Sequence, residues 1–397
     1  MNARRPSLDI AIVGGGMVGA ACALALARRG FTVALLEARE PAPWNAADPE
    51  DLRVIALAPS SARLLDKLGA WRAIETARVS PYSHMRVWDG ESGAELTFDA
   101  AREGRAQLGW IVENKLVACT LWDALGAAGV RRVCPAHVAS FVQREDRITL
   151  ELGDGEMLSA ALLVIADGAD SALRDQAGIA VRGRDYQQRA VVAHVATERA
   201  HDATAWQRFT DEGPIALLPL ADGRSSIVWS LPEARAREVL ALDDAAFCDA
   251  AGIASDFRLG TVTSTTPRAS FPLRLQIAER FASGRCVLIG DAAHAVHPLA
   301  GQGANLGLRD VAELASVLGA ARDAGRDFAP PHVLQRYARR RRSEGVLDAR
   351  TFDAIERMFA WQSPTWATLR GVGMRAVDAI EPLKRRLSAH AEGRARI

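Results

Sequence analysis

The pattern Gly-x-Gly-x-x-Gly near the start of the chain constrains its fold more than any other feature. Gly14, Gly16 and Gly19 follow an apolar, β-branched run, Leu8–Val13, which predicts a buried parallel strand. In a strand–turn–helix unit the first glycine permits a tight turn, the second lets the backbone approach a pyrophosphate, and the third lets the helix pack closely on the strand. The pattern therefore predicts a dinucleotide-binding turn rather than a packing turn.

The residues after the turn complete this unit. Residues 17–29 predict a helix, and residues 31–36 predict a second strand that ends at Glu37. The amino end of the helix offers free N–H groups and a partial positive charge to phosphates. Glu37 can accept hydrogen bonds from both ribose hydroxyls and would repel a 2′-phosphate. FAD or NAD is therefore expected at this turn, and NADP is not.

The same segment could be mistaken for a targeting or membrane segment. Residues 1–5 are basic and residues 10–27 carry no charge, as in a signal peptide. The glycines of the turn interrupt the apolar run, and another uncharged run long enough to span a bilayer does not occur. The segment is therefore predicted to be part of the fold.

Charge and cysteine content exclude several classes of protein. The formal net charge is +1, so no overall field favours nucleic acid. The five cysteines are scattered and never spaced as CxxC, which argues against a disulfide framework and a metal site and agrees with a reducing cytoplasm. These cysteines are Cys22, Cys119, Cys134, Cys248 and Cys286.

Two later segments also place glycines and acidic residues at strand ends. Residues 162–174 predict a strand that runs into an Asp167-Gly168 turn, and residues 286–289 predict a strand followed by Gly290-Asp291-Ala292-Ala293-His294. A second glycine-containing loop, 297–305, opens a helix and provides another cradle of backbone N–H groups. Aimed at a flavin ring, that cradle would stabilise negative charge on the reduced ring. NAD alone would need only the first turn, so these segments favour FAD.

The middle of the chain has a different pattern. Between residues 181 and 271, short alternating segments are separated by turn signals, which predicts an antiparallel sheet. The predicted strands are 190–195, 215–218 and 226–230, with Trp88 and residues 96–98 as further strand candidates.

The predicted architecture is an α/β fold, α+β overall, in which a mostly antiparallel sheet is inserted into a Rossmann-like domain. The Rossmann-like domain is discontinuous, and a helical region closes the chain. The boundaries are 1–80, 100–180 and 268–335 for the cofactor domain, 81–99 and 181–267 for the substrate domain, and 336–397 for the helical region.

Taken together, these motifs resemble the single-component aromatic-ring flavin hydroxylases with the p-hydroxybenzoate hydroxylase-like fold. The segments 51–57, 109–114, 213–220 and 297–308 are similar to the ubiquinone-biosynthesis branch of that family. The resemblance extends from about residue 8 to about residue 390. It implies a monooxygenase that uses FAD, O2 and NADPH or NADH, and that hydroxylates a polyprenylated phenol through a flavin hydroperoxide.

The resemblance also implies which residues hold FAD. The first turn and Glu37 would bind the ADP half, and Arg53 the ribose and phosphates. Asn114 stands where related enzymes often carry a basic residue. Asp167 would take part in handling FAD and the nicotinamide, and Asp291 would bind the ribityl–pyrophosphate region. The implied cofactor-binding set is Gly14, Gly15, Gly16, Met17, Val18, Gly19, Glu37, Arg53, Asn114, Asp167, Asp291, Pro298, Gly301, Gln302, Gly303, Ala304 and Asn305.

A catalytic base is harder to identify. A para-hydroxyphenol needs deprotonation for attack, and histidine is the commonest base, so His294 and His297 are the candidates. For His294 a packing or hydrogen-bonding role within its motif is favoured. For His297 the two roles are equally supported.

Substrates of this branch reside in membranes, so the resemblance implies a cytoplasmic enzyme that contacts the inner face of the membrane peripherally and works with other proteins of the quinone pathway. Met358, Phe359, Trp361 and Trp366 near the basic run 339–342 could form a lipid-facing surface. Packing of these side chains into the core is favoured, because such stripes are usually buried.

Other functions stay open at this point. A hydroxylase of a small soluble phenol shares all the cofactor motifs, and a flavin-dependent prenyl-chain reductase has related ones. A non-catalytic flavoprotein scaffold would have no reason to keep the loop 297–305. The ring position, the choice between NADPH and NADH, and the tail length are not determined by these motifs.

Overall fold

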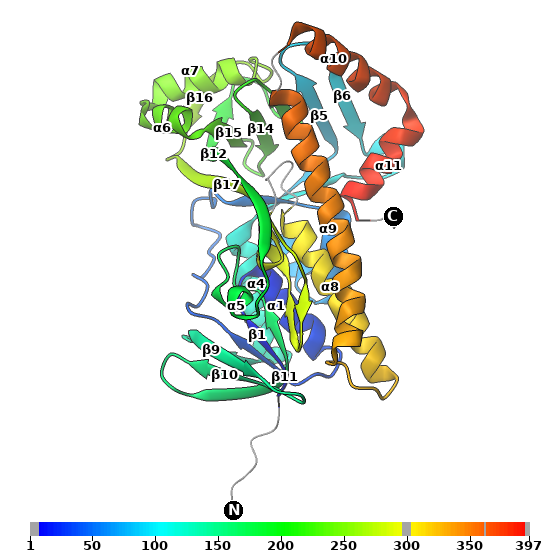
Figure 1. Ribbon diagram of the computed structural model, residues 1–397. Coiled ribbons are helices and arrows are strands. Elements are labelled where there is room, and N and C mark those ends of the chain that lie inside the picture. Colours follow the sequence, from blue (N-terminus) through cyan, green and yellow to red (C-terminus); the bar gives the residue numbers. More distant parts are fainter. Residues whose placement is uncertain (1–7, 296–302, 361–362, 394–397) are drawn as a thin grey trace, which may run out of the picture.

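The computed structural model describes residues 8–295, 303–360 and 363–393. Two sheet regions lie one above the other, and the long helix α9 (Pro331–Ala360) runs beside both (Figure 1). The lower region in that view carries the first strand–turn–helix unit. The upper region carries the antiparallel sheet, so the two patterns distinguished in the sequence occupy different parts of the molecule.

The lower region is built on an eight-stranded sheet with a parallel centre. Its order is β18-β19-β11-β1-β2-β8, and β9 and β10 extend it as antiparallel strands beside β11. β11 and β2 flank β1 in parallel register, with Ile12 opposite both Val164 and Leu35. The strands are β1 (Leu8–Val13), β2 (Val33–Leu36), β8 (Arg131–Val133), β9 (Val138–Gln143), β10 (Ile148–Leu152), β11 (Met157–Ile165), β18 (Ala282–Ser283) and β19 (Cys286–Leu288).

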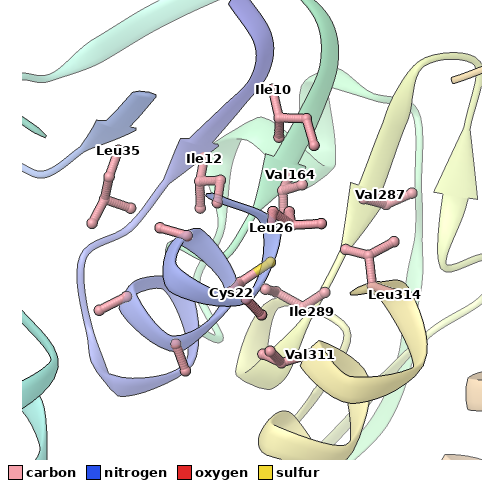
Figure 2. Close-up of a cluster of buried hydrophobic side chains, with 14 of the residues drawn as sticks. Ile10, Ile12, Cys22, Leu26, Leu35, Val164, Val287, Ile289, Val311 and Leu314 are labelled. Carbon is pink, nitrogen blue, oxygen red and sulfur yellow. The ribbon is translucent and has the colours of Figure 1, made fainter. Parts of the chain in front are cut away.

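Helix α1 (Met17–Ala27) is buried on all sides, which explains why its sequence resembles a membrane segment. It packs between the sheet and helices α4 (Asn114–Ala127) and α8 (Gly303–Asp323). Figure 2 shows the resulting core, in which Cys22 and Leu26 of α1 meet Val311 and Leu314 of α8. Burial raises the pKa of the Cys22 thiol, so this cysteine is a small apolar core residue.

The upper region is built on a nine-stranded sheet that is mainly antiparallel. Its order is β20-β17-β12-β15-β14-β13-β5-β6, with β16 beside β12. Among the described strands of this sheet, β13 and β5 are the one pair that runs in parallel. The strands are β5 (His84–Asp89), β6 (Glu95–Asp99), β12 (Val181–Thr197), β13 (Thr204–Phe209), β14 (Pro214–Pro219), β15 (Ser225–Pro232), β16 (Val262–Thr265), β17 (Ala269–Ala278) and β20 (His294–Ala295). Helices α6 (Glu233–Ala241) and α7 (Asp244–Ala254) cover one face of this sheet.

A small three-stranded sheet lies between the two regions, in the order β3-β7-β4. Its residues Ala56 and Ile111 pack against Leu218 of the upper sheet, so it joins the two parts. The strands of this sheet are β3 (Val54–Leu57), β4 (Val79–Tyr82) and β7 (Gly109–Glu113). The remaining short elements are α2 (Pro59–Lys67), α3 (Trp71–Ala77) and the 3₁₀ turn η1 (Ala101–Glu103), and, following strands of the eight-stranded sheet, α5 (Ala172–Gln176) and the 3₁₀ turn η2 (Gly290–Ala292).

The described part of the chain ends in helices, as predicted. After α9 come α10 (Pro364–Ala379) and α11 (Glu381–Ala391), which lie against the upper region beside β6 (Figure 1). Arg370 of α10 forms a bidentate ion pair with Asp89 of β5, with N–O distances of 2.8 and 2.9 Å. The helical region is therefore attached to the antiparallel sheet by a buried charge pair.

The predicted α/β fold is confirmed, and the predicted strands at 190–195, 215–218, 226–230 and 96–98 lie within β12, β14, β15 and β6. The prediction missed α6 and α7, because the whole of residues 181–271 was taken as sheet. Pro232 ends β15 there, and Asp243 caps α7 through Ala246 N. The domain boundaries given above stay a prediction.

Candidate active site

The glycine turn between β1 and α1 has the geometry that its sequence predicts. Gly14 has φ +106°, and a Cβ there would lie 2.2 Å from the carbonyl oxygen of Ala166 at the end of β11. A Cβ on Gly19 would lie 1.9 Å from the Gly14 oxygen, so this residue too must be glycine. A Cβ on Gly16 would meet nothing within 4 Å. The turn is therefore packed on its inner side and open at Gly16.

The open side of the turn fits a pyrophosphate. Gly16 is the N-cap of α1. The first turn of this helix has neither a side-chain cap nor an acidic residue. Its N–H groups therefore remain available to an anion, at the positive end of the helix dipole. Met17 and Val18 continue this first turn of α1. Gly290 packs against Val18, so the segment 290–294 lies beside the glycine turn.

Glu37 follows β2 directly and lies beside the glycine turn. Its carboxylate accepts hydrogen bonds from Gly15 N at one oxygen and from Arg39 N, 3.1 Å away, at the other. Gly15 itself is packed between Glu37 and Trp122, and a Cβ there would lie 2.8 Å from the Trp122 ring. The carboxylate is thus held by the backbone beside the place where the nucleotide would lie.

Arg174 connects the two later segments that the sequence singled out, residues 162–174 and residues 290–294. Ser171 caps α5 by accepting a hydrogen bond from Arg174 N, and the Arg174 guanidinium donates to Ala169 O at 2.8 Å and to Ala292 O at 3.4 Å. Burial raises the pKa of Asp167, the second residue after the end of β11. Asp291 is exposed on η2, so its carboxylate is available to a ligand.

Asn305 and its neighbours form the first turn of α8. The Asn305 side chain is buried and bonded within the protein: it accepts from Ala58 N (2.9 Å) and Ser61 Oγ (2.7 Å) and donates to Ala56 O (2.7 Å). Its amide therefore fixes α8 to the end of β3 and the start of α2. Gly303 and Ala304 are half-buried beside it. Pro298, Gly301, Gln302 and His297 lie outside the described residues.

A buried carboxylate organises the segment that precedes β3. Glu113 accepts hydrogen bonds from Arg78 Nε (2.8 Å), Asp51 N (2.7 Å) and Trp44 Nε1 (3.1 Å). Arg53, two residues after Asp51, is exposed, and within the described ranges no hydrogen bond engages its guanidinium. Asn114 is fixed by its backbone N–H, which donates to Arg53 O at 2.9 Å.

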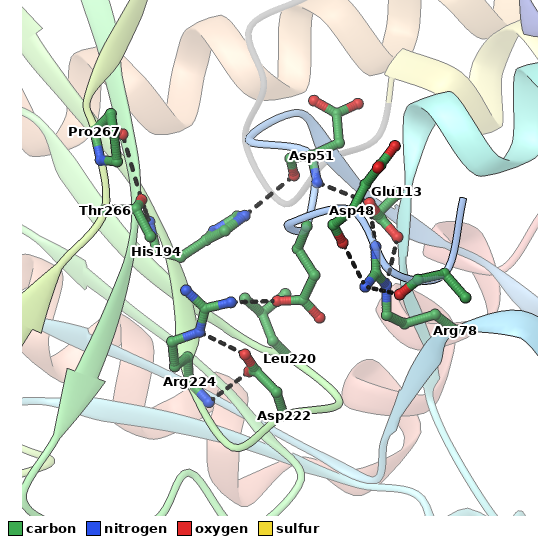
Figure 3. A network of polar contacts seen from close by, with 12 residues as sticks. Asp48, Asp51, Arg78, Glu113, His194, Leu220, Asp222, Arg224, Thr266 and Pro267 are labelled. Carbon is green, nitrogen blue, oxygen red and sulfur yellow. Dashed lines mark hydrogen bonds and ion pairs between the residues drawn. The ribbon is translucent and has the colours of Figure 1, made fainter. Parts of the chain in front are cut away.

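Polar contacts also connect this segment to the antiparallel sheet (Figure 3). His194 of β12 places Nε2 3.1 Å from Asp51 O, and Arg224 pairs with Glu50 at 3.0 Å and with Asp222 at 2.5 Å. Burial is the main cause that lowers the pKa of His194, which is therefore neutral at pH 7. These contacts hold the two regions together at the point where the three-stranded sheet meets β12 and β15.

His294 occupies a position that favours a structural role. Its Nε2 lies 2.7 Å from Asp310, and Asp310 also accepts from Arg341 Nε (2.6 Å) and Gly290 N (2.9 Å). The ring packs between Phe281 and helix α9. The His294, Asp310 and Arg341 side chains are almost completely buried, and they fix the segment 290–294 to α8 and α9.

The aromatic cluster of the helical region also packs into the interior. Phe359 is stacked on Phe209 of β13, with ring centroids 3.9 Å apart, and Met358 packs beside it. Trp366 donates to Met358 O at 3.0 Å. Trp361 lies outside the described residues. The core interpretation of this cluster is the one that these contacts support.

Sequence reasoning missed two groups at the site. Glu113 lies next to Asn114 in a segment that the sequence analysis singled out, but its pairing with Arg78 depends on tertiary structure. His194 is one histidine in an alternating strand, without a motif around it. Only its alternation with Val191, Ala193 and Val195, which share the opposite face, could have placed it on the inner face of the sheet.

The sequence matches known proteins over nearly its full length. Residues 7–348 match a family model described as FAD binding domain. The chain is 39% identical over 388 residues to 3-demethoxyubiquinol 3-hydroxylase of Escherichia coli (strain K12), with 97% of this chain and 98% of that protein covered. It is 38% identical to ubiquinone hydroxylase UbiL of Rhodospirillum rubrum, with 97% and 89% covered, and 32% identical to human mitochondrial ubiquinone biosynthesis monooxygenase COQ6, with 96% and 92% covered.

Solved structures resemble this fold at low sequence identity. The p-nitrophenol 4-monooxygenase PnpA from Pseudomonas putida DLL-E4 has a TM-score of 0.76 at 20% identity, with 98% of this chain and 99% of that chain covered. Klebsiella pneumoniae HpxO complexed with FAD and uric acid has a TM-score of 0.75 at 20% identity, with 99% and 98% covered. These likenesses establish the fold.

Proposed function

This chain belongs to the FAD-binding monooxygenase family of the ubiquinone-biosynthesis hydroxylases, and on that premise we propose that it hydroxylates the aromatic ring of a polyprenylated ubiquinone precursor. The observation that carries the proposal is the convergence of three strand-end turns beside an apolar sheet face. Gly16, Glu37 and Asp291 mark the three places where FAD would be held. O2 and NADPH or NADH are the co-substrates.

The cofactor supplies the redox chemistry: when bound, FAD takes electrons from the nicotinamide and activates O2 for transfer to the ring. The chain binds and orients it. The α1 N-terminus and Glu37 would hold the ADP half, and Arg53 and Asp291 the phosphates and the ribityl chain. The first turn of α8 would present backbone N–H groups to the flavin ring. The inner face of the antiparallel sheet keeps water from the reacting ring.

Mass spectrometry of quinone-pathway lipids tests this proposal. A strain that lacks the protein should accumulate a prenylphenol one hydroxyl short of the normal product, and the purified holoenzyme should introduce one oxygen atom from labelled O2 into it. A normal lipid profile together with turnover of water-soluble phenols would favour the soluble-phenol hydroxylase instead. Reduction of the prenyl chain without O2 consumption would favour the reductase.

We also propose that α10 and α11 contact the membrane that holds the substrate. These two helices and the residue between them carry five of the large apolar side chains that the described structure exposes, and three exposed arginines lie among them. The apolar residues are Leu369, Val372, Ile380, Leu383 and Leu387, and the cations are Arg375, Arg385 and Arg386. Apolar side chains beside cations suit the surface of an anionic bilayer. None of the described helices is long and apolar enough to cross a membrane.

Flotation with vesicles tests the membrane contact. The protein should float with vesicles that contain anionic lipid, less so with neutral ones, and L369E/L383E should abolish flotation. V142E is the matched control, because Val142 is equally exposed on β9 in the other region. Equal flotation of L369E/L383E and the wild type, or none with any vesicle, would contradict the proposal. In the second case a complex with other pathway proteins would be the partner to examine.

A further inference from the structure

The antiparallel sheet presents an inner face to the cofactor region, and alternation along its strands identifies which residues lie on it. Residues that pack under α6 and α7 form one cluster, so their sequence neighbours must point the other way. The residues under the helices are Val191, Ala193 and Val195 on β12, and Ile227, Trp229 and Leu231 on β15. The residues on the inner face are therefore Ala190, Val192 and His194 on β12, and Ser226, Val228 and Ser230 on β15.

The inner face is apolar around its centre. Val228 is half-buried and packs against two small clusters, one with Leu218 and Ile111, the other with Tyr186 and Ala190. An aromatic ring with an apolar tail fits such a surface, because it needs burial and little hydrogen bonding. Its hydroxyl, in contrast, needs a polar partner.

Two polar groups lie together at one end of this face without partners. His194 and Ser226 are directly opposite each other in the β12–β15 register, and both are 1% exposed. Within the described residues, neither His194 Nδ1 nor Ser226 Oγ has a hydrogen-bond partner. An unpaired buried polar atom costs about 1–3 kcal/mol, so two adjacent ones indicate a place where a ligand supplies the missing partner.

The contacts of the His194 ring define what that ligand must offer. Nε2 lies 3.1 Å from Asp51 O, and because a carbonyl oxygen only accepts, Nε2 must carry the proton. Nδ1 of the neutral ring is then a bare acceptor, and it requires a donor such as a phenolic O–H. Asp51 is itself fixed, since its N–H donates to Glu113 at 2.7 Å. The ring is thus oriented in advance by the cofactor region.

We propose that His194 Nδ1 and Ser226 Oγ form the subsite that binds the hydroxyl of the aromatic substrate. His194 accepts the hydroxyl proton in a hydrogen bond, which raises electron density on the ring, and Ser226 fixes the same oxygen. This proposal rests on the proposed function and names a specificity-determining pair for it. His294 does not compete for the role, because its ring is enclosed between Phe281 and α9.

Two substitutions of His194 separate the subsite from a structural role. In H194Q the amide reaches the Nε2 position and keeps the Asp51 contact but loses the acceptor at Nδ1. In H194N the amide oxygen stands near the Nδ1 position and the Asp51 contact is lost. The probe is a phenol that carries one isoprene unit, and its Kd is measured from the change in flavin fluorescence of the oxidised holoenzyme.

The expected result is a three- to tenfold rise in Kd for H194Q and for S226A, roughly the effect of one lost hydrogen bond, and a smaller rise for H194N. S225A is the matched control, because Ser225 is buried and adjacent but lies on the helix-covered side, opposite Val195. Its Kd should equal that of the wild type. The reverse order, with H194N more impaired than H194Q, would show that the ring only joins the two regions and would overturn the proposal.

The binding measurement also distinguishes this proposal from the proposed function. If the wild type binds the probe but never hydroxylates it, the proposed function is contradicted. The subsite proposal is then still tested by the Kd values of the four variants. If the wild type hydroxylates the probe and all four variants bind it equally, the subsite alone fails. A wild type that does not bind the probe at all overturns both.

Discussion

Replacement of Asp310 by asparagine should strongly destabilise the cofactor region. The Asp310 carboxylate is completely buried and receives three donors: His294 Nε2 at 2.7 Å, Arg341 Nε at 2.6 Å and Gly290 N at 2.9 Å. An asparagine has one acceptor oxygen, and its amide would point a donor at another donor. Arg341, whose side chain is 2% exposed, would keep only Glu344 as a counter-charge.

The size of the effect follows from burial. Removing one partner of a buried ion pair costs about 3–5 kcal/mol, and because Glu344 remains, the lower end, about 3 kcal/mol, is expected. That is a large part of a typical free energy of unfolding of roughly 5–15 kcal/mol. Urea unfolding followed by circular dichroism and by flavin fluorescence measures it. D323N on the same helix is the control, because its pair with Arg29 is exposed and should change stability by less than about 1 kcal/mol.

The dependence on pH provides a second test of the same argument. Burial alone would raise the pKa of Asp310, but the charges of His294 and Arg341 bring it below the ordinary value of 3.8. The unfolded chain therefore takes up this proton first as the pH falls. The stabilisation by Asp310 is complete above pH 3.8 and is lost below it. A D310N variant within about 1 kcal/mol of the wild type at pH 7 would refute the reasoning, as would a difference that is unchanged at pH 3.

Three further variants examine the cofactor turn and the helical region. G16A should fold normally but bind FAD roughly tenfold more weakly, as measured by fluorescence titration. G126A in α4 is the control, because an added Cβ there also meets no atom within 4 Å, and it should leave FAD affinity unchanged. Equal FAD affinities of the two variants would contradict the assignment of the pyrophosphate to Gly16. E37Q should keep the contact to the turn but lower FAD affinity roughly three- to tenfold through the ribose, and an unchanged Kd would place the ribose elsewhere. R370M leaves Asp89 buried without its bidentate partner and should lower the free energy of unfolding by about 3–5 kcal/mol. Limited proteolysis should then release α10 and α11 early. An unaltered cleavage pattern would show that other contacts hold these helices.

The sequence allowed the local parts of this structure to be predicted. The strand and the glycine turn at residues 8–19 were recognisable because close packing restricts Gly14 and Gly19 to glycine. Strands such as β14 were recognisable from turn signals at both ends. The helices α6 and α7 were not, although Asp243 is an N-cap, because alternating segments before and after them dominated the reading of residues 181–271.

The long-range parts could not be predicted, because their partners lie far apart along the chain. Arg370 and Asp89 are separated by 281 residues, and His194 and Asp51 by 143. From the sequence alone, any of several arginines could have paired with any of several acidic residues. The arrangement of the strands and helices in the fold decides which of these side chains meet. For the same reason the helical region's aromatic residues were assigned to the core by general preference, and Phe209 as the partner of Phe359 could not be named.

The long helix α9 has a mechanical consequence for turnover. Its 30 residues span about 45 Å, and sharp kinks in such a helix are almost always found at a proline, a Gly/Ser pair or a bulge. One end is fixed to α8 through Arg341, and the other to the antiparallel sheet through Phe359 and through Asp353, which lies 3.5 Å from Tyr186. With β12 and β17 as further connections, we expect the two regions to move little relative to each other. Two fluorophores placed on the two regions should then report a single distance throughout the reaction, and a second distance during turnover would contradict this expectation.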